Sequence, residues 1–176
     1  YPIESKVLVE SYLRGMEQSV TLFLHNGKCK FSVVIDKNKG DLPYFFETGH
    51  TIPSPRVNEI QKDYFINGAI SAAQAIGLTN GPVIVDMVQA ESEEPSVIEV
   101  AARLPGDEMT SLLRKCGVCL HEAAILSSLG ETPNIPKLNG AASIHFIYSR
   151  FGTVQKTVAP EPETLPKGVD MKIYVH

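Results

Sequence analysis

Two pairs of β-rich segments, each joined by turn-forming residues, constrain the fold of this 176-residue chain most strongly. In the first pair, Asn26 and Gly27 separate two apolar, β-branched runs. Because both residues tolerate positive φ angles, Asn-Gly between such runs is a strong signal for a tight hairpin. We therefore predict antiparallel strands over residues 7–24 and 28–36.

The second pair of β-rich segments covers residues 83–88 and 96–101 and brings two acids together. If the turn is centred between residues 92 and 93, directly opposed residues have index numbers that add up to 185, so Asp86 faces Glu99. Their Cβ atoms would then lie about 4.5–5.5 Å apart on one face of the sheet. Arg103 would share the face of Glu99, because side chains alternate along a strand.

Two opposed carboxylates on an otherwise apolar stripe require a proton or a cation between them. Hard oxygen ligands favour Mg²⁺ or Mn²⁺, and an arginine suits an anionic substrate or a phosphoryl group in transfer. Asp86 and Glu99 are therefore candidate metal ligands, with Arg103 as a candidate catalytic group. The alternative, an exposed face whose acids are simply solvated, stays open on the pattern alone.

The remaining segments predict an α+β fold with mostly antiparallel sheets and packed helices. Residues 36–55 form a long loop with several lysines, glycines and prolines, and Ser54-Pro55 is typical of a helix start. The other predicted elements are a helix over 55–76, a helical stretch over 107–129 interrupted at Gly117, a linker at 133–136, and short strands at 142–148, 153–158 and 171–175.

The amino-acid composition indicates a globular protein and speaks against a nucleic-acid partner or a membrane span. The apolar content is 43%, enough to form a core, and the net charge is −4, which speaks against a general nucleic-acid partner. No run approaches the about 18 apolar residues of a membrane span. Three cysteines favour a reducing, cytoplasmic location. Cys116 and Cys119 have redox-like spacing, but without a second pair we expect them to pack in the interior.

The motifs in order resemble the ATP-grasp superfamily, and within it the C-terminal part of L-amino-acid ligases. Residues 97–106 (Val-Ile-Glu-Val-Ala-Ala-Arg-Leu-Pro-Gly) resemble the metal-site strand, and Gly81-Pro82 followed by Asp86 resembles the strand with the first metal carboxylate. Residues 7–17 resemble the hinge strand beside adenine. Residues 47–50 (Glu-Thr-Gly-His) resemble the loop over the triphosphate, and residues 140–158 the small C-terminal segment.

The resemblance implies an ATP-dependent carboxylate–amine ligase that forms an acyl phosphate with Mg²⁺ or Mn²⁺. Its substrates would be small molecules, a carboxylate and an amine, and we expect amino acids. Carried over to this sequence, the family's roles fall on these residues: Asp86 and Glu99 bind the metal, Arg103 steadies the transferred group, His50 faces the substrate, Glu10 and Leu13 flank adenine, Glu17 binds ribose, and Lys37 contacts phosphate.

One departure from the family pattern bears on activity. Ala101 stands where the family has an asparagine metal ligand, so we expect weakened metal binding. A non-catalytic nucleotide-binding module is therefore an alternative, as is a relative of carbamoyl-phosphate synthase or biotin carboxylase.

The resemblance also predicts how the chain is organised. Residues 1–132 would be the C-terminal half of the nucleotide- and metal-binding domain, and residues 133–176 a small β-rich subdomain. We expect the N-terminal half of the same enzyme to be a missing partner, which would leave this chain inactive alone. A homodimer is a further possibility that the edge strands allow.

Overall fold

The computed structural model describes residues 7–40, 46–90, 94–148, 153, 155, 156 and 158–173. The chain divides into two compact units, Tyr1–Phe146 and Ile147–His176. The described part of the second unit contains a short 3-10 helix, η1 (Pro162–Thr164). No helix among the described residues is long and apolar enough to cross a membrane. The predicted boundary after residue 132 stays a prediction.

The described residues of the first unit form strands and helices of ordinary length. Their order is β1 (Met16–His25), β2 (Lys28–Lys39), β3 (Glu47–Ile52), α1 (Glu59–Ala75), β4 (Gly81–Gln89), β5 (Ser96–Ala101), α2 (Met109–Lys115), α3 (Leu120–Ser128) and β6 (Ala142–His145).

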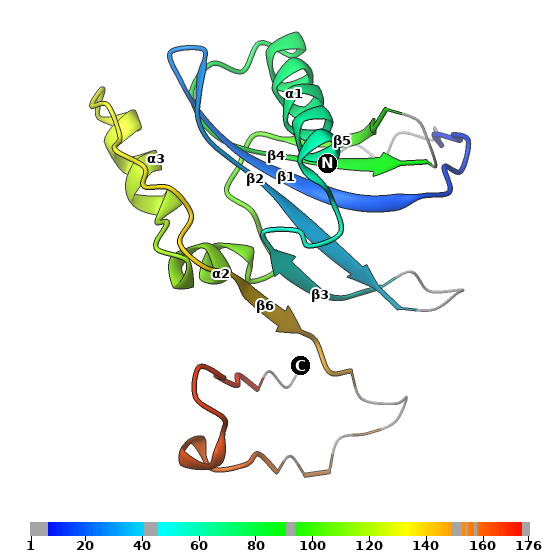
Figure 1. Cartoon of the computed structure of the whole chain (residues 1–176), viewed down its shortest axis with the longest axis vertical. Helices are drawn as coiled ribbons and strands as arrows, with labels where there is room; N and C mark the ends of the chain where they lie inside the picture. Colours follow the sequence, from blue (N-terminus) through cyan, green and yellow to red (C-terminus); the bar gives the residue numbers. More distant parts are fainter. Residues whose placement is uncertain are drawn as a thin grey trace. The chain divides into compact units, whose positions relative to one another are not determined.

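The strands of this unit form one sheet in the order β5-β4-β1-β2-β3-β6, and every neighbouring pair is antiparallel (Figure 1). Both predicted hairpins are present, as β1–β2 and β4–β5. The prediction of an α+β fold with a mostly antiparallel sheet is confirmed.

The first hairpin turns where the sequence predicted, but its first strand begins later. Asn26 and Gly27 adopt φ angles of 52° and 72°, and His25 pairs with Lys28. Residues 7–15 were predicted as strand and are not. Their apolar side chains do not make a strand by themselves, because the ladder partners supplied by the neighbouring strands begin only at Met16.

The prediction of one long loop over residues 36–55 is wrong. β2 continues to Lys39, and β3 pairs with it from Glu47 onward. The polar residues that look like a loop in the sequence instead project from paired strands into the site described below. Residues 41–45 lie outside the described part of the chain.

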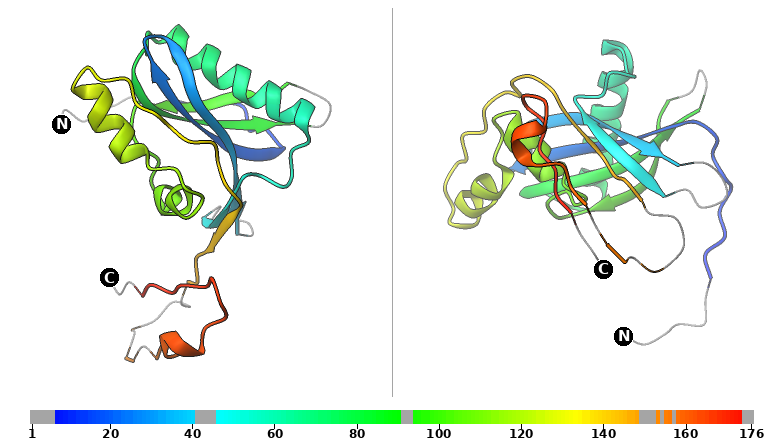
Figure 2. Two further views of the ribbon diagram at one scale, coloured as in Figure 1. Left: turned by 60° about the vertical axis from the view of Figure 1, so that its left-hand side comes forward. Right: turned by 90° about the horizontal axis from the view of Figure 1, so that it is seen from below.

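Helix α1 covers one face of the sheet (Figure 2) and starts later than predicted. Asn58 is its N-cap, because Asn58 and Gln61 form a reciprocal capping box. Ser54 is not the cap: its hydroxyl is buried and donates to the carboxylate of Asp36. The helix buries Phe65, Ala69 and Ala73 against the apolar side chains of the sheet: Val20, Leu22, Leu24, Val34, Val83, Val85 and Met87.

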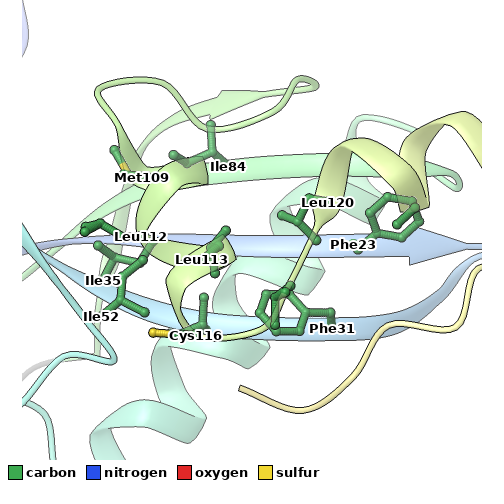
Figure 3. Packing of buried hydrophobic residues seen from close by; sticks show 13 residues of the cluster. Phe23, Phe31, Ile35, Ile52, Ile84, Met109, Leu112, Leu113, Cys116 and Leu120 are labelled. Atoms are coloured by element: carbon green, nitrogen blue, oxygen red, sulfur yellow. The ribbon is translucent and has the colours of Figure 1, made fainter. Parts of the chain in front are cut away.

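Helices α2 and α3 pack on the opposite face of the sheet, where they cover a second apolar cluster (Figure 3). The predicted break at Gly117 is confirmed, because this glycine has a φ angle of 83° and lies between the two helices. Cys116 is buried in the cluster, as expected of a packing residue. Its other members include Phe23, Phe31, Ile35, Ile52, Ile84, Met109, Leu112, Leu113 and Leu120.

The predicted C-terminal strands are longer than the observed strand or are absent from the described residues. The strand predicted over 142–148 ends at His145, where its pairing with β3 stops. The described residues of the segments 153–158 and 171–175 are not in strands. The other residues of these two segments lie outside the described part of the chain.

Candidate functional site

The candidate site lies on the sheet face that α2 and α3 partly cover, at the end where apolar side chains give way to polar ones. The register of the strands decides which side chains meet there. Asp86 of β4 lies opposite Glu99 of β5, so the predicted opposition of the two acids is confirmed. On its other side Asp86 lies opposite Ser19 of β1, whose hydroxyl donates to its carboxylate.

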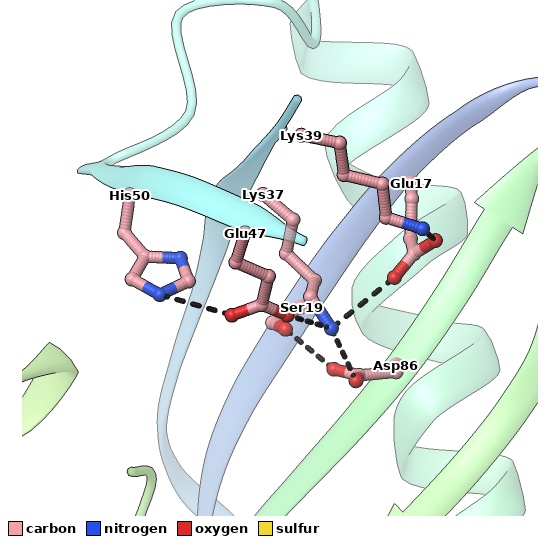
Figure 4. A network of polar contacts seen from close by, with 7 residues as sticks. All are labelled: Glu17, Ser19, Lys37, Lys39, Glu47, His50 and Asp86. Carbon is pink, nitrogen blue, oxygen red and sulfur yellow. Dashed lines mark hydrogen bonds and ion pairs between the residues drawn. The ribbon is translucent and has the colours of Figure 1, made fainter. Parts of the chain in front are cut away.

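Lys37 of β2 is the centre of this group of polar side chains (Figure 4). Its Nζ atom lies 2.7 Å from Asp86 Oδ2, 2.7 Å from Glu47 Oε1 and 3.1 Å from Glu17 Oε1. The Lys37 side chain is only 9% exposed. Lys39 forms a further ion pair with Glu17. One nearly buried ammonium group therefore holds carboxylates from three different strands.

The charges of this group fix its protonation. Burial by itself lowers the pKa of Lys37, but the hydrogen bonds and charges of Asp86 and Glu47 outweigh burial and raise it. The neighbouring His50 ring, and then Lys37, lower the pKa of Glu47 to about 2 against the opposing effect of burial. Near neutral pH the lysine is therefore a cation and Glu47 an anion.

His50 of β3 lies beside Glu47 and is completely buried. Its Nε2 atom is 3.4 Å from Glu47 Oε2, and its ring meets Phe146 edge-on with centroids 5.6 Å apart. Neither ring nitrogen forms a hydrogen bond with the described residues. The prediction that His50 faces a substrate is compatible with this placement and stays a prediction.

A small pocket opens beside the two opposed acids. Arg103 is exposed at this pocket, and its Nη1 donates to the carbonyl oxygen of Leu104 at 3.0 Å. The structure thus brings together the residues predicted to bind metal and phosphate with the position where the family has an asparagine. The lining includes Lys37, Glu47, Asp86, Glu99, Ala101, Arg103 and Asp107.

A wider groove adjoins the site and gathers the residues predicted to contact nucleotide. Glu10 and Leu13 lie on the exposed segment before β1, and both line this groove. Glu17 and Lys37 line it as well, so the groove and the small pocket share Lys37. Glu17 was predicted to bind ribose, and here its carboxylate is occupied by the two lysines.

Sequence reasoning missed four side chains of the site: Ser19, Lys39, Glu47 and Asp107. Ser19 had a usable signal, since it stands two residues from Glu17 in a predicted strand and therefore on the same face. Lys39 had none, because residues 36–55 were predicted as a loop. Glu47 belongs to the motif of residues 47–50 quoted above, but no role was assigned to it, and a bulge between Asn38 and Lys39 shifts its register. Asp107 belongs to the turn before α2, and its placement depends on tertiary packing.

Comparison with known proteins defines the class of this chain. Residues 2–111, more than half of the sequence, match the family described as the ATP-grasp domain. The chain therefore belongs to the ATP-grasp family, and the resemblance read from its motifs is confirmed.

The chain is also similar to a curated protein. It is 29% identical over 131 residues to carnosine synthase 1 of Gallus gallus, an alignment that covers 74% of this chain and 14% of that protein. The chain thus spans a small part of the length of this curated relative.

Solved structures share the fold. The L-amino acid ligase from Bacillus licheniformis matches with a TM-score of 0.61 and 20% identity, over 67% of this chain and 30% of that chain. The phosphoribosylglycinamide synthetase from Anaerococcus prevotii matches with a TM-score of 0.68 and 20% identity, over 77% and 36%. At these identities the likeness shows the fold alone.

Proposed function

We propose that this chain forms part of an ATP-dependent carboxylate–amine ligase that joins amino acids through an acyl phosphate. The observation that carries the proposal is the opposition of Asp86 and Glu99 in a pocket that also receives Lys37 and Arg103. The partial identity with a carnosine synthase supports amino acids as the substrates.

The residues of the pocket fit Mg²⁺ or Mn²⁺ at Asp86 and Glu99. Both offer carboxylate oxygens, the ligands that hard divalent cations prefer, and Glu99 is exposed to the pocket. When bound, the ion would neutralise charge on the phosphate oxygens. Ala101 contributes no oxygen, so we expect this ion to be held more weakly than by an asparagine-containing site.

The other residues of the site position the reactants. Lys37, which pairs with carboxylates here, is placed to bind a phosphate, and Glu10, Leu13 and Glu17 line the groove for the nucleoside. Arg103 would stabilise the transferred phosphoryl group. A substrate carboxylate oxygen bonds to the γ-phosphorus as the bond to ADP breaks. An amine nitrogen then bonds to the acyl carbon as inorganic phosphate leaves and the amine loses a proton.

The proposal is tested by phosphate release in a protein that contains this chain, with ATP, Mg²⁺ and pairs of amino acids. We expect Asp86→Asn and Glu99→Gln to reduce the rate about 100-fold or more, because each removes a charge from the metal site. Asp63→Asn is the matched control, since Asp63 is exposed on α1 outside the site. Equal rates in all three variants would refute the assignment.

A second candidate function, a nucleotide-binding module without turnover, is favoured by Ala101 alone. Calorimetric titration of ATP with Mg²⁺ separates the two candidates. Binding together with phosphate release on addition of amino acids supports the ligase. Binding without phosphate release for any amino-acid pair supports the module. Restoring an oxygen ligand with Ala101→Asn should tighten Mg²⁺-dependent ATP binding in either case.

A further inference from the structure

The buried imidazole of His50 is not explained by the packing around it. Its side chain is 0% exposed, and apart from the 3.4 Å contact of Nε2 with Glu47 Oε2 neither ring nitrogen has a hydrogen-bond partner among the described residues. A buried polar group in this state costs free energy unless a ligand satisfies it. Phe146 meets the ring edge-on, and the Nε2 atom lies next to Glu47.

Two carboxylates share the space in front of this nitrogen. Glu47 lies beside it on β3, and Asp107 belongs to the turn before α2. One ligand atom each from Glu47, His50 and Asp107 lies within 4.8 Å of the other two. Glu47 presents its Oε1 atom to Lys37 and its Oε2 atom to His50, so its two oxygens face different neighbours.

The spacing of these atoms fits ligands of a single metal ion. Metal–ligand distances of about 2.0–2.2 Å in a tetrahedral site place two ligand atoms about 3.3–3.6 Å apart. The distance between His50 Nε2 and Glu47 Oε2 is 3.4 Å. We propose that Glu47, His50 and Asp107 form a binding site for a divalent transition-metal ion, separate from the carboxylate pair of Asp86 and Glu99.

The ligand chemistry sets the class of ion. One imidazole with two carboxylates suits Zn²⁺, Fe²⁺ or Co²⁺, whereas Mg²⁺ and Ca²⁺ prefer oxygen ligands alone. Glu47 and Asp107 line the same pocket as Asp86 and Glu99, so the ion would sit beside the magnesium site proposed above. This site goes beyond the proposed ligase reaction and does not depend on it.

The test is a titration of the full chain with Co²⁺ in the absence of nucleotide, read by visible absorption. Millimolar Mg²⁺ is present to compete for the carboxylate pair. We expect Co²⁺ to bind with the absorption of an imidazole-containing site. His50→Gln and Asp107→Asn should each weaken binding at least tenfold. Asn tolerates the positive φ of residue 107 about as well as Asp, so the second variant should fold.

Matched controls decide where the ion binds. Asp63→Asn changes the same charge on an exposed helix residue and should leave Co²⁺ affinity within about twofold of the parent chain. Glu99→Gln should also leave the Co²⁺ affinity within about twofold of the parent chain. Unchanged affinity in Asp107→Asn, loss of binding in Glu99→Gln, or displacement of Co²⁺ by Mg²⁺ would each overturn the proposal. If His50→Gln unfolds, as judged by circular dichroism, Asp107→Asn decides alone.

Discussion

At the scale of single residues, Lys37 supplies the positive charge that the carboxylates of the site share. Its ammonium group contacts Glu17, Glu47 and Asp86, and no second cation reaches all three among the described residues. Lys37→Met should therefore destabilise the chain by about 1–3 kcal/mol, less than a fully buried pair would cost, since the acids are partly exposed. Urea unfolding measures the change.

Lys39→Met is the matched control for this substitution. Lys39 is 33% exposed and its described ion pair is with Glu17, so its loss should cost less than about 1 kcal/mol. Millimolar Mg²⁺ should restore part of the stability of the Lys37 variant, because a divalent cation can replace the ammonium charge among the carboxylates. Equal effects of the two substitutions would show that Lys37 has no special role.

The same residues show what the sequence could predict about the site. Asp86 and Glu99 were found because opposed residues of an antiparallel pair have a constant index sum, and the assumed sum of 185 holds at this pair. Beyond a register shift after Asp86, the pair Met87 and Val97 adds up to 184 instead. The network around Lys37 was not predicted, because it joins β1, β2, β3 and β4. No local sequence pattern indicates the order in which strands pair in a sheet. His50 was selected from a motif, but its burial was not foreseen.

At the scale of elements, the pairing of β3 with β6 depends on one glycine. A Cβ atom on Gly49 would lie 2.1 Å from the carbonyl oxygen of Ile144, far closer than any real contact. Gly49→Ala should thus force β6 away from β3 and cost about 3 kcal/mol or more. Hydrogen exchange of the β6 amides, together with urea unfolding, measures the effect.

Gly77→Ala controls for backbone strain without a clash. Gly77 ends α1 with a φ angle of 81°, and nothing lies within 4 Å of the position a Cβ would take. Its substitution should cost about 1 kcal/mol, the penalty of a left-handed conformation. If both alanine variants lose the same stability, the close approach of β3 and β6 is not what requires Gly49.

Elements were predicted well where the signal was local and poorly where it was not. The Asn26-Gly27 hairpin and the break at Gly117 follow from the φ angles that these residues tolerate. Residues 36–39 were read as loop because they are polar. The structure shows that polar residues also occur inside a paired strand when its face lines a site. The start of α1 was misplaced because Ser54 donates its hydroxyl to Asp36, whereas Asn58 and Gln61 form the capping box of the helix.

At the scale of the whole molecule, burial separates the two units of the chain. The core clusters consist of residues from the first unit, which carries α1 on one sheet face and α2 and α3 on the other. In the second unit every described residue is exposed except Leu165, which is half-buried. The site and both pockets are likewise formed by residues of the first unit.

This division predicts that residues 1–146 keep their stability when residues 147–176 are removed. The deletion takes away no described residue of either apolar cluster, so the free energy of unfolding in urea should change by less than about 0.5 kcal/mol. The truncated chain should also keep the Co²⁺ affinity of the parent chain, since Glu47, His50 and Asp107 remain. A broad, non-cooperative transition after truncation would show instead that the C-terminal unit completes the fold.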